Sequence, residues 1–347
     1  MARSALREEL INEPTLSIED IKAPALAALE KTKLTIISEL KAQVPMIETI
    51  TNYLIERGGK RLRPTVLLLS AQAIQAAQGQ ADAKLDTPIL LATVVELIHS
   101  ATLLHDDIVD ESELRRGQKT ANANWGNAAS VLAGDFLYSR AFQILARVAD
   151  IPISQQLANT TNQLAEGEMM QLVEAHKANM SVDEYWQVIT LKTATLFECA
   201  CKIGAMTVNG SDTQVKAMAD YGLAFGMAYQ IIDDTLDYQN SSDTLGKDRF
   251  NDLNEGKMTL PLILTKALAT DDLKTVIDNI MAGNTPTEAE QNNIYHAMLE
   301  HNIFAKCHDY AASYIKTAQT ALQTITTYHP AWQSLNQLSE YILKRRY

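Results

Sequence analysis

The sequence predicts an all-α protein. Apolar residues recur at the i, i+3, i+4 and i+7 spacing of amphipathic helices along almost the whole chain, whereas the period-two alternation of half-buried strands is hard to find. The 347 residues include only 14 glycines and 9 prolines, so few positions interrupt the helices. With 46% hydrophobic residues, the chain has ample material for a core. We therefore expect a bundle of helices.

The first strongly apolar helix is expected to begin at Thr87-Pro88, because threonine is a favoured N-cap and proline a favoured first helical residue. From Ile89 to Leu104 almost no polar face remains. A helix that is apolar all round is buried, so we place this one in the core. Its apolar run ends at His105.

A second central helix is expected from Tyr221 to Tyr238, where apolar residues again dominate. Gly222 and Gly226 lie four residues apart, on one face of this helix. Because glycine has no side chain, another helix backbone can approach closely at these two positions.

The remainder of the chain reads as ordinary amphipathic helices and polar breaks. Three such helices are expected over residues 181–205, 260–269 and 302–325. Polar breaks are expected at 240–243 and 282–286. Because no repeat or long linker divides the chain, we expect a single domain over residues 26–347, preceded by a loosely attached N-terminal segment over residues 1–25.

Composition excludes several classes of function. With 42 acidic and 30 basic residues the net charge is −12, so the chain lacks the positive field that nucleic-acid binding requires. No uninterrupted apolar stretch of about 18 residues predicts a transmembrane helix. Three cysteines are too few for a disulfide framework, and the first ten residues lack the apolar region of a secretory signal. We expect a cytoplasmic protein.

Each of the two apolar helices runs into an aspartate cluster with the pattern D-D-x-x-D. The six residues are Asp106, Asp107, Asp110, Asp233, Asp234 and Asp237. Positions i and i+4 share one helix face, so like charges come within about 5–6 Å between Cβ atoms. Burial makes this repulsion more costly, so the clusters require cations. Carboxylate oxygens favour Mg²⁺ or Mn²⁺, with substrate phosphate completing the coordination.

Two other interpretations of the clusters are weaker. Solvated surface aspartates are not expected to follow an apolar helix twice in the same pattern. A carboxylate-bridged di-iron site uses Glu-x-x-His pairs on facing helices, and no such pair accompanies either cluster.

Positive charge is concentrated at a few places in this acidic chain. The candidate anion-binding residues are Lys60, Arg63, Arg115, Arg116, Lys192, Lys247 and Lys257. Arginine suits bidentate contact with phosphate oxygens. Together with two metal clusters, these cations predict a site for two highly charged groups, each expected to be a diphosphate. No G-x-x-x-x-G-K-[ST] loop occurs, so nothing indicates nucleotide hydrolysis.

Four stretches resemble the motifs of one known family: GGKRLRP at 58–64, LIHSATLLHDDIVD at 97–110, GDFLY at 134–138 and QIIDDTLD at 230–237. They are similar to those of the trans-isoprenyl (polyprenyl) diphosphate synthases, above all the octaprenyl diphosphate synthases of bacterial quinone synthesis. The resemblance implies an all-α isoprenoid synthase fold, a helical bundle around a central active-site cavity. It also implies a homodimer and three Mg²⁺ ions between the two clusters.

The resemblance assigns roles to individual residues. Contacts to isopentenyl diphosphate are implied for Lys60, Arg63, His99 and Arg116. Contacts to the allylic diphosphate are implied for Arg115, Lys192, Thr193, Gln230, Lys247 and Lys257, of which Lys192, Thr193 and Gln230 are the expected catalytic residues. Direct metal ligands are expected at Asp106, Asp110 and Asp233, and contacts through water or hydrogen bonds at Asp107, Asp234 and Asp237.

One position departs from the family pattern. The loop after the second cluster usually reads G-K-x-x-G-x-D-L, but Phe250 stands here in place of the second glycine. If that position needs a positive φ, phenylalanine is strained there. The departure puts the loop geometry, and with it the placement of Lys247, in question.

The expected reaction is ionisation of an allylic diphosphate, attack by the C4 alkene of isopentenyl diphosphate and proton loss to the released diphosphate. The growing chain needs a tunnel, expected along the first helix past Thr102, Ala101, Ile98 and Val94. The small Ala101 and Thr102 stand where related short-chain enzymes often carry Tyr or Phe. The sequence thus favours a long product; the resemblance favours octaprenyl diphosphate for quinone side chains, made from farnesyl diphosphate.

Other functions and contacts stay open at this point. A geranylgeranyl diphosphate synthase would share the metal site, and a non-catalytic subunit of a heteromeric synthase would be expected to have lost one of the motifs. The C-terminal Lys344-Arg345-Arg346 either closes over the site or forms a solvated basic tail. Transient membrane contact is expected when a long product is released.

Overall fold

The computed structural model describes residues 17–56, 59–115, 117–239 and 249–345. Two short strands pair in an antiparallel hairpin, and nearly all other regular structure is helical. The elements are α2 (Ile18–Lys22), η1 (Ala23–Ala25), α3 (Leu26–Glu39), α4 (Pro45–Glu56), α5 (Leu62–Ala77), α6 (Asp86–Val109), β1 (Leu114–Arg115), β2 (Gln118–Lys119), α7 (Ala121–Trp125), α8 (Asn127–Val148), α9 (Ile151–Glu174), α10 (Val182–Ile189), η2 (Thr190–Ala194), α11 (Thr195–Met206), α12 (Asp212–Gln239), α14 (Asn251–Asn254), α15 (Leu260–Leu268), α16 (Asp271–Met281), α17 (Glu288–Glu300), α18 (Ile303–Leu322) and α19 (Pro330–Leu343). The all-α prediction is confirmed.

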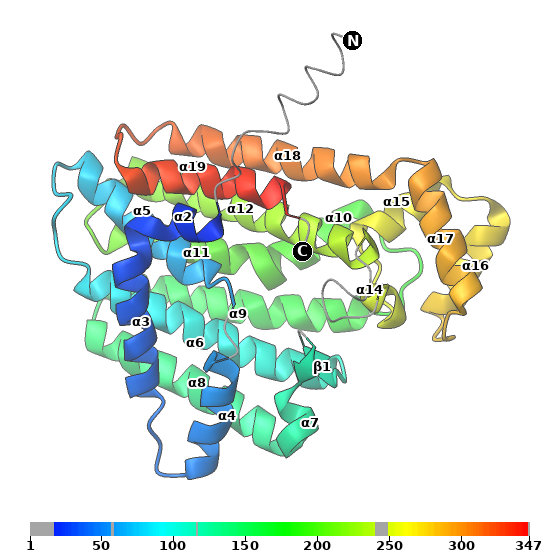
Figure 1. The fold of residues 1–347 in the computed structure, drawn as a ribbon, viewed down its shortest axis with the longest axis horizontal. Helices are drawn as coiled ribbons and strands as arrows, with labels where there is room; N and C mark the ends of the chain where they lie inside the picture. The colour runs from blue at the N-terminus through cyan, green and yellow to red at the C-terminus, as the bar shows by residue number, and fades with distance from the viewer. Residues whose placement is uncertain (1–16, 57–58, 116, 240–248, 346–347) are drawn as a thin grey trace, which may run out of the picture.

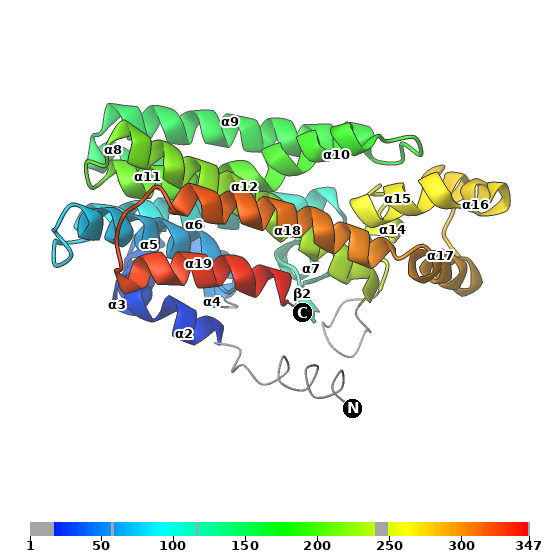
Figure 2. The ribbon, with the colours of Figure 1, turned by 90° about the horizontal axis from the view of Figure 1, so that it is seen from above.

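The long helices run roughly side by side in layers (Figures 1 and 2). α6 packs against α8, α5 and α3, whereas α12 packs against α11 and α18. α16 and α17 project from one end of the bundle, on the right in Figure 1. The two helices predicted to be central, α6 and α12, both lie inside this arrangement.

α6 begins at Asp86, so the predicted start at Thr87-Pro88 is wrong by two residues. Leu85 is the N-cap and makes no side-chain cap hydrogen bond. Pro88 lies in the first turn. Backbone N–H groups there have no intrahelical acceptor, so a proline, which lacks the N–H, costs no hydrogen bond. By length and composition α6 could cross a membrane, but 72% of its apolar window is buried inside the fold. Burial in the protein core therefore explains its apolar surface.

α12 begins before the predicted Tyr221, at Asp212, and its glycines meet a neighbouring helix as expected. A Cβ built on Gly222 would lie 2.5 Å from the Phe197 carbonyl oxygen. A Cβ on Gly226 would lie 2.6 Å from the Ala194 Cα. Only glycine admits this close packing of α12 against the 181–205 region.

The helix predicted over 181–205 is present but interrupted. α10 starts after a capping box at Ser181, where Ser181 and Glu184 satisfy each other's backbone N–H groups. Thr190–Ala194 then forms a π-helical turn before α11 continues to Met206. π-turns are frequent at functional sites because they turn adjacent side chains toward the same space.

The other predicted boundaries fall close to the observed ones. α15 and α18 match the helices expected at 260–269 and 302–325, and the break at 282–286 separates α16 from α17. The break at 240–243 lies outside the described residues. The expected loose segment over 1–25 is tied down in its described part, since Ile21 is 2% exposed and Ala25 fully buried. Packing against the rest of the fold therefore already includes α2, before residue 26.

Candidate active site

The first aspartate cluster lies at the C-terminal end of α6, where the helix leaves the core. Asp107 is 2% exposed and accepts a 2.7 Å hydrogen bond from Nε of Arg115. Asp110 caps the helix end, and its Oδ1 is 3.0 Å from Nζ of Lys257. Arg115 belongs to strand β1 of the hairpin. Two cations thus contact this cluster directly.

Burial perturbs the ionisation of Asp106 in the first cluster. Burial raises the pKa of its carboxyl to about 7, an effect that Lys192 opposes and Glu168 reinforces. A cation bound beside this carboxyl would lower its pKa again, because the cation would stabilise the charged form. Burial also raises the pKa of Tyr138 to about 12, and the negative charges of Asp106 and Glu168 add to this effect.

The three aspartates of the second cluster differ in their surroundings. Asp233 has a side chain that is 50% exposed. Asp234 is 5% exposed and accepts hydrogen bonds of 2.6 Å from the Tyr185 hydroxyl and from Nε2 of Gln230. Burial raises the pKa of Asp234 well above its usual range. Asp233 is therefore open to a ligand, whereas Asp234 faces inward.

Asp237 ties the second cluster to the segment that follows it. Its Oδ2 accepts a hydrogen bond from the Asp252 backbone N–H at 3.2 Å, and its carbonyl accepts one from Phe250 at 3.3 Å. Phe250 has φ of +65° and is 4% exposed, so the position does require the left-handed region. Its ring packs edge-on against Tyr238, with centroids 5.7 Å apart, which offsets the strain.

The π-turn connects its own residues to both carboxylate clusters. Lys192 Nζ lies 2.7 Å from Glu168, and its charge lowers the pKa of Asp106 against the larger effect of burial. The Thr193 hydroxyl donates a 2.8 Å hydrogen bond to Oε1 of Gln230, whose amide nitrogen bonds Asp234. The three residues predicted as catalytic therefore lie in one connected group.

The predicted isopentenyl diphosphate contacts lie at the start of α5 and on α6. An Arg63 Nη1 is 3.1 Å from Nε2 of His99, and the guanidinium stacks 4.6 Å from the Phe197 ring centroid. Burial lowers the pKa of Arg63, while Tyr229, Glu96 and the aspartates counter it. Lys60 Nζ lies 5.5 Å from the ring centre of Tyr341 on α19.

Arg345, which follows α19, reaches the second cluster. Its Nη2 donates to Oδ1 of Asp233 at 3.0 Å, and its guanidinium lies 4.7 Å from the Tyr229 ring centroid. The side chain is only 8% exposed, so this part of the basic tail is not solvated. Lys344 is exposed, and Arg346 lies outside the described residues.

The charges around the two clusters fit divalent cations. Lys257 and Arg345 each lie 3.0 Å from an aspartate oxygen, which shows that the clusters attract positive charge. The possible metal ligands are carboxylate oxygen atoms, which Mg²⁺ prefers. No group of three or more His, Cys, Asp or Glu side chains converges into a ready-made metal cage within the part of the chain that the structure describes. Substrate phosphate would therefore have to complete any coordination.

The predicted chain-length residues line the packed side of α6. Val94 and Ala101 are fully buried and Ile98 is 1% exposed. Thr102 is half-buried, and its hydroxyl donates to the His99 carbonyl at 2.8 Å. Three of these side chains are thus shielded from solvent, and Thr102 is shielded in part.

Some predicted residues are not placed, and two others were missed. Arg116 and Lys247 lie outside the described residues. Glu168 on α9 and Tyr185 on α10 belong to the site but carried no signal, because neither stands in a recognisable pattern. Gly167, immediately before Glu168, lies against the π-turn, since a Cβ there would lie 2.6 Å from the Lys192 backbone nitrogen.

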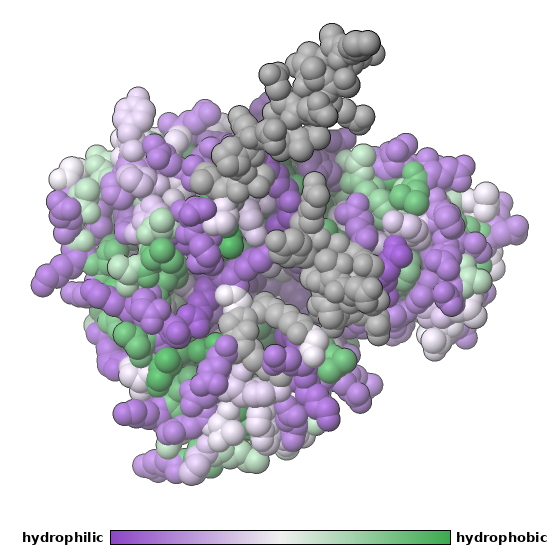
Figure 3. Space-filling view, in the orientation of Figure 1, coloured by the Kyte–Doolittle hydropathy of each residue, from purple (hydrophilic) through white to green (hydrophobic). Residues whose placement is uncertain are grey.

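Hydrophilic side chains gather near the centre of the face seen in Figure 3. The polyprenyl synthetase family model matches residues 44–298, which include both clusters and the cations between them. The chain belongs to the polyprenyl synthetase family. Members of this family are prenyltransferases, so the prediction of an enzyme of this kind is confirmed.

Individual relatives agree with the family assignment. The octaprenyl diphosphate synthase of Haemophilus influenzae is 44% identical over 248 residues, 72% of this chain and 73% of that protein. The geranylgeranyl diphosphate synthase of Methanosarcina mazei is 33% identical over 302 residues, 86% of this chain and 89% of that one.

A solved structure confirms the isoprenoid synthase fold. The polyprenyl synthase from Caulobacter crescentus CB15, complexed with calcium and isoprenyl diphosphate, superposes with a TM-score of 0.90. It is 34% identical and matches 96% of this chain and 100% of its own.

Proposed function

We propose that this chain is a long-chain trans-polyprenyl diphosphate synthase that extends an allylic diphosphate, farnesyl diphosphate in the first instance, with isopentenyl diphosphate. The observation that carries the proposal is the pair of carboxylate clusters on α6 and α12, each already contacted by a cation. Membership of the polyprenyl synthetase family and the octaprenyl diphosphate synthases among its relatives support the long product.

Three Mg²⁺ ions, or Mn²⁺ in their place, are proposed to bind through Asp106, Asp110 and Asp233 together with the allylic diphosphate. When bound, they supply charge neutralisation for the departing diphosphate. Asp107, Asp234 and Asp237 are proposed to orient the site through hydrogen bonds. Such bonds from Arg115, Tyr185 and Gln230 hold two of these carboxylates in place.

The chain's own cations are proposed to bind the two substrates. Lys192, Arg115 and Lys257 would hold the allylic diphosphate, helped by Lys247, which lies outside the described residues. Arg63, His99 and Lys60 would hold isopentenyl diphosphate, helped by Arg116, which also lies outside the described residues. Arg63 has little room to move, because His99 and the Phe197 ring enclose its guanidinium.

Catalysis then consists of holding charges and excluding water. The allylic C–O bond breaks and its electron pair leaves with the diphosphate. The C4 alkene carbon of isopentenyl diphosphate forms the new bond, and the released diphosphate takes the C2 proton. Gln230, held by Thr193, presents its amide dipole beside the reacting end of the substrate. The apolar walls of α6 and α12 keep water from the cation.

A second candidate is a short-chain synthase that makes geranylgeranyl diphosphate. The relative from Methanosarcina mazei favours it, as does the closed packing of Ala101 and Ile98. The two candidates share the metal site and differ only in product length.

The proposal also includes a homodimer, a cytoplasmic location and transient membrane contact during product release. Exposed apolar side chains support the first, since Leu132 on α8 is 65% exposed and Phe142 on the same helix is 40% exposed. Leu34 and Ile37 on α3, 59% and 45% exposed, are apolar surface that a membrane contact would use.

Transfer of labelled isopentenyl diphosphate to farnesyl diphosphate tests the catalytic part of the proposal. Asp106→Asn and Asp233→Asn are expected to lower kcat by about 10²–10³-fold or more, because each removes a charge that holds a metal ion. Asp272→Asn, exposed on α16, is the matched control and should keep wild-type kcat. Wild-type rates in all three variants, or no transfer by the wild type, would contradict the proposal.

A further inference from the structure

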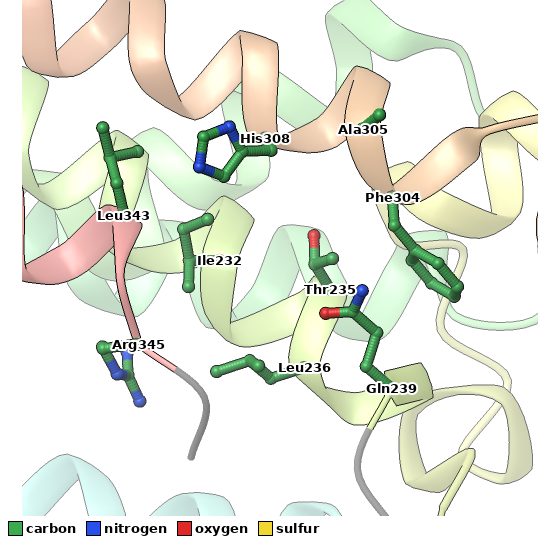
Figure 4. Close-up of a pocket in the computed structure, with 9 residues that line it drawn as sticks. All are labelled: Ile232, Thr235, Leu236, Gln239, Phe304, Ala305, His308, Leu343 and Arg345. Carbon is green, nitrogen blue, oxygen red and sulfur yellow. The ribbon is translucent and has the colours of Figure 1, made fainter. Parts of the chain in front are cut away.

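A cavity of about 230 Å³ lies between α12, α18 and the C-terminal end of α19 (Figure 4). Ile232, Leu236, Phe304 and Leu343 make most of its wall apolar. Arg345 and His308 border it as well. Its volume lies below the range of about 300–1,000 Å³ of drug-sized sites, so it fits a small ligand.

Arg345 links this cavity to the second aspartate cluster. One nitrogen, Nη2, donates to Asp233, whereas Nε and Nη1 are buried and have no hydrogen-bond acceptor among the described residues. The side chain is 92% enclosed. Buried donors of a charged group are costly to leave unpaired, so an acceptor in the cavity would be bound favourably.

We propose that the cavity is a regulatory binding site for a small branched aliphatic anion, with a phosphate-monoester or carboxylate head. The head would accept from the two unpaired nitrogens of Arg345, and the aliphatic body would lie against Ile232, Leu236 and Phe304. This combination of one guanidinium and an apolar wall selects an amphiphilic anion over a purely polar or purely apolar molecule.

Binding in the cavity would increase the affinity of Asp233 for a divalent metal. A bound anion draws the guanidinium toward itself and neutralises its charge, so it weakens the ion pair that competes with metal for Asp233 and reduces the repulsion of the metal. The two effects act in the same direction. By linkage, metal would tighten the anion to the same degree. This second step rests on the proposed metal-binding role of Asp233.

Titration calorimetry on the full metal-free chain tests the binding site, with isopentenyl monophosphate and 4-methylpentanoate as probes. At least one probe should saturate a single site. Ala305→Trp, which fills the cavity from α18, and Arg345→Gln should each weaken that binding by about tenfold or more. Ser313→Trp, exposed on the same helix, is the matched control and should bind as the wild type does. Arg63→Gln should also leave probe binding unchanged, which separates the cavity from the isopentenyl diphosphate contacts.

The linkage is read from Mn²⁺ binding, followed by electron paramagnetic resonance with and without saturating probe. The probe should lower the Mn²⁺ dissociation constant by about fivefold in the wild type and leave it unchanged in Ala305→Trp. Absence of saturable binding, or equal binding by Ala305→Trp, would overturn the site. Binding that leaves the Mn²⁺ affinity unchanged would overturn the regulation. Because neither measurement needs turnover, a chain that binds the probe but transfers no prenyl group would refute the proposed function alone.

Discussion

At the residue scale, the cost of burying Asp106 is the clearest electrostatic feature of the site. Its folded pKa of about 7 lies above the ordinary value, so the folded protein binds more protons than the unfolded chain between about pH 4 and 7. The contribution of Asp106 to stability is therefore most favourable below that window. It declines as the pH rises through the window and is constant above it.

Asp106→Asn is expected to remove this pH dependence. In metal-free protein the variant should be more stable than the wild type at pH 8, by on the order of a few kcal/mol, and closer to it at pH 5. Thermal unfolding between pH 5 and 8 measures the difference. A wild-type stability that rises over this range, with the variant following in parallel, would show that Asp106 is not the group responsible.

Residue-level prediction succeeded where a pattern carried a physical requirement. The glycine-like position of Phe250 does have a positive φ, as the family pattern implied. The packing of its ring on Tyr238 could not be foreseen, because the contact depends on how α12 and the loop meet in space. The ion pair between Arg345 and Asp233 is equally non-local, so the sequence left two alternatives for the tail.

At the element scale, Gly226 of α12 allows the π-turn to lie against that helix, and Gly222 allows the close approach of α11. Gly226→Ala would place a Cβ 2.6 Å from the Ala194 Cα, and backbone cannot yield cheaply there. We expect a loss of about 1–3 kcal/mol in unfolding free energy and a larger fall in kcat than in substrate affinity, because Thr193 and Lys192 shift.

Urea unfolding and steady-state kinetics of Gly226→Ala check this expectation. Lys216→Ala, exposed on the same helix, controls for general effects on α12. Wild-type stability and kcat in Gly226→Ala would show that the close approach of α12 to Ala194 matters neither for stability nor for catalysis.

The periodicity of apolar residues predicted where helices occur, but it did not predict where a helix is interrupted. α6, α12, α15 and α18 follow the apolar pattern closely, whereas the π-turn at 190–194 adds a residue without changing the composition of the helix. The start of α6 was misplaced because Thr87-Pro88 looks like a cap, although Leu85 takes that position. Glu168 and Tyr185 were missed because their roles arise only when α9, α10 and α12 pack together.

At the scale of the whole molecule, the exposed apolar face of α8 underlies the proposed homodimer. Leu132→Glu should convert the dimer to a monomer, because a charge in the centre of an apolar interface is not paired. Leu299→Glu on α17, which replaces a leucine of 47% exposure, should leave the assembly intact. Light scattering after size-exclusion chromatography gives the masses. A monomeric mass for the wild type would contradict the proposed homodimer.

The length of the product tests the central claim most directly. The purified protein is incubated with Mg²⁺, farnesyl diphosphate and excess isopentenyl diphosphate, and the products are measured by mass spectrometry. We predict a dominant octaprenyl product, and a shorter one from Ala101→Tyr, because a ring at that buried position on α6 blocks the path of the chain. A single four-isoprene product from the wild type would contradict the claim of a long-chain synthase.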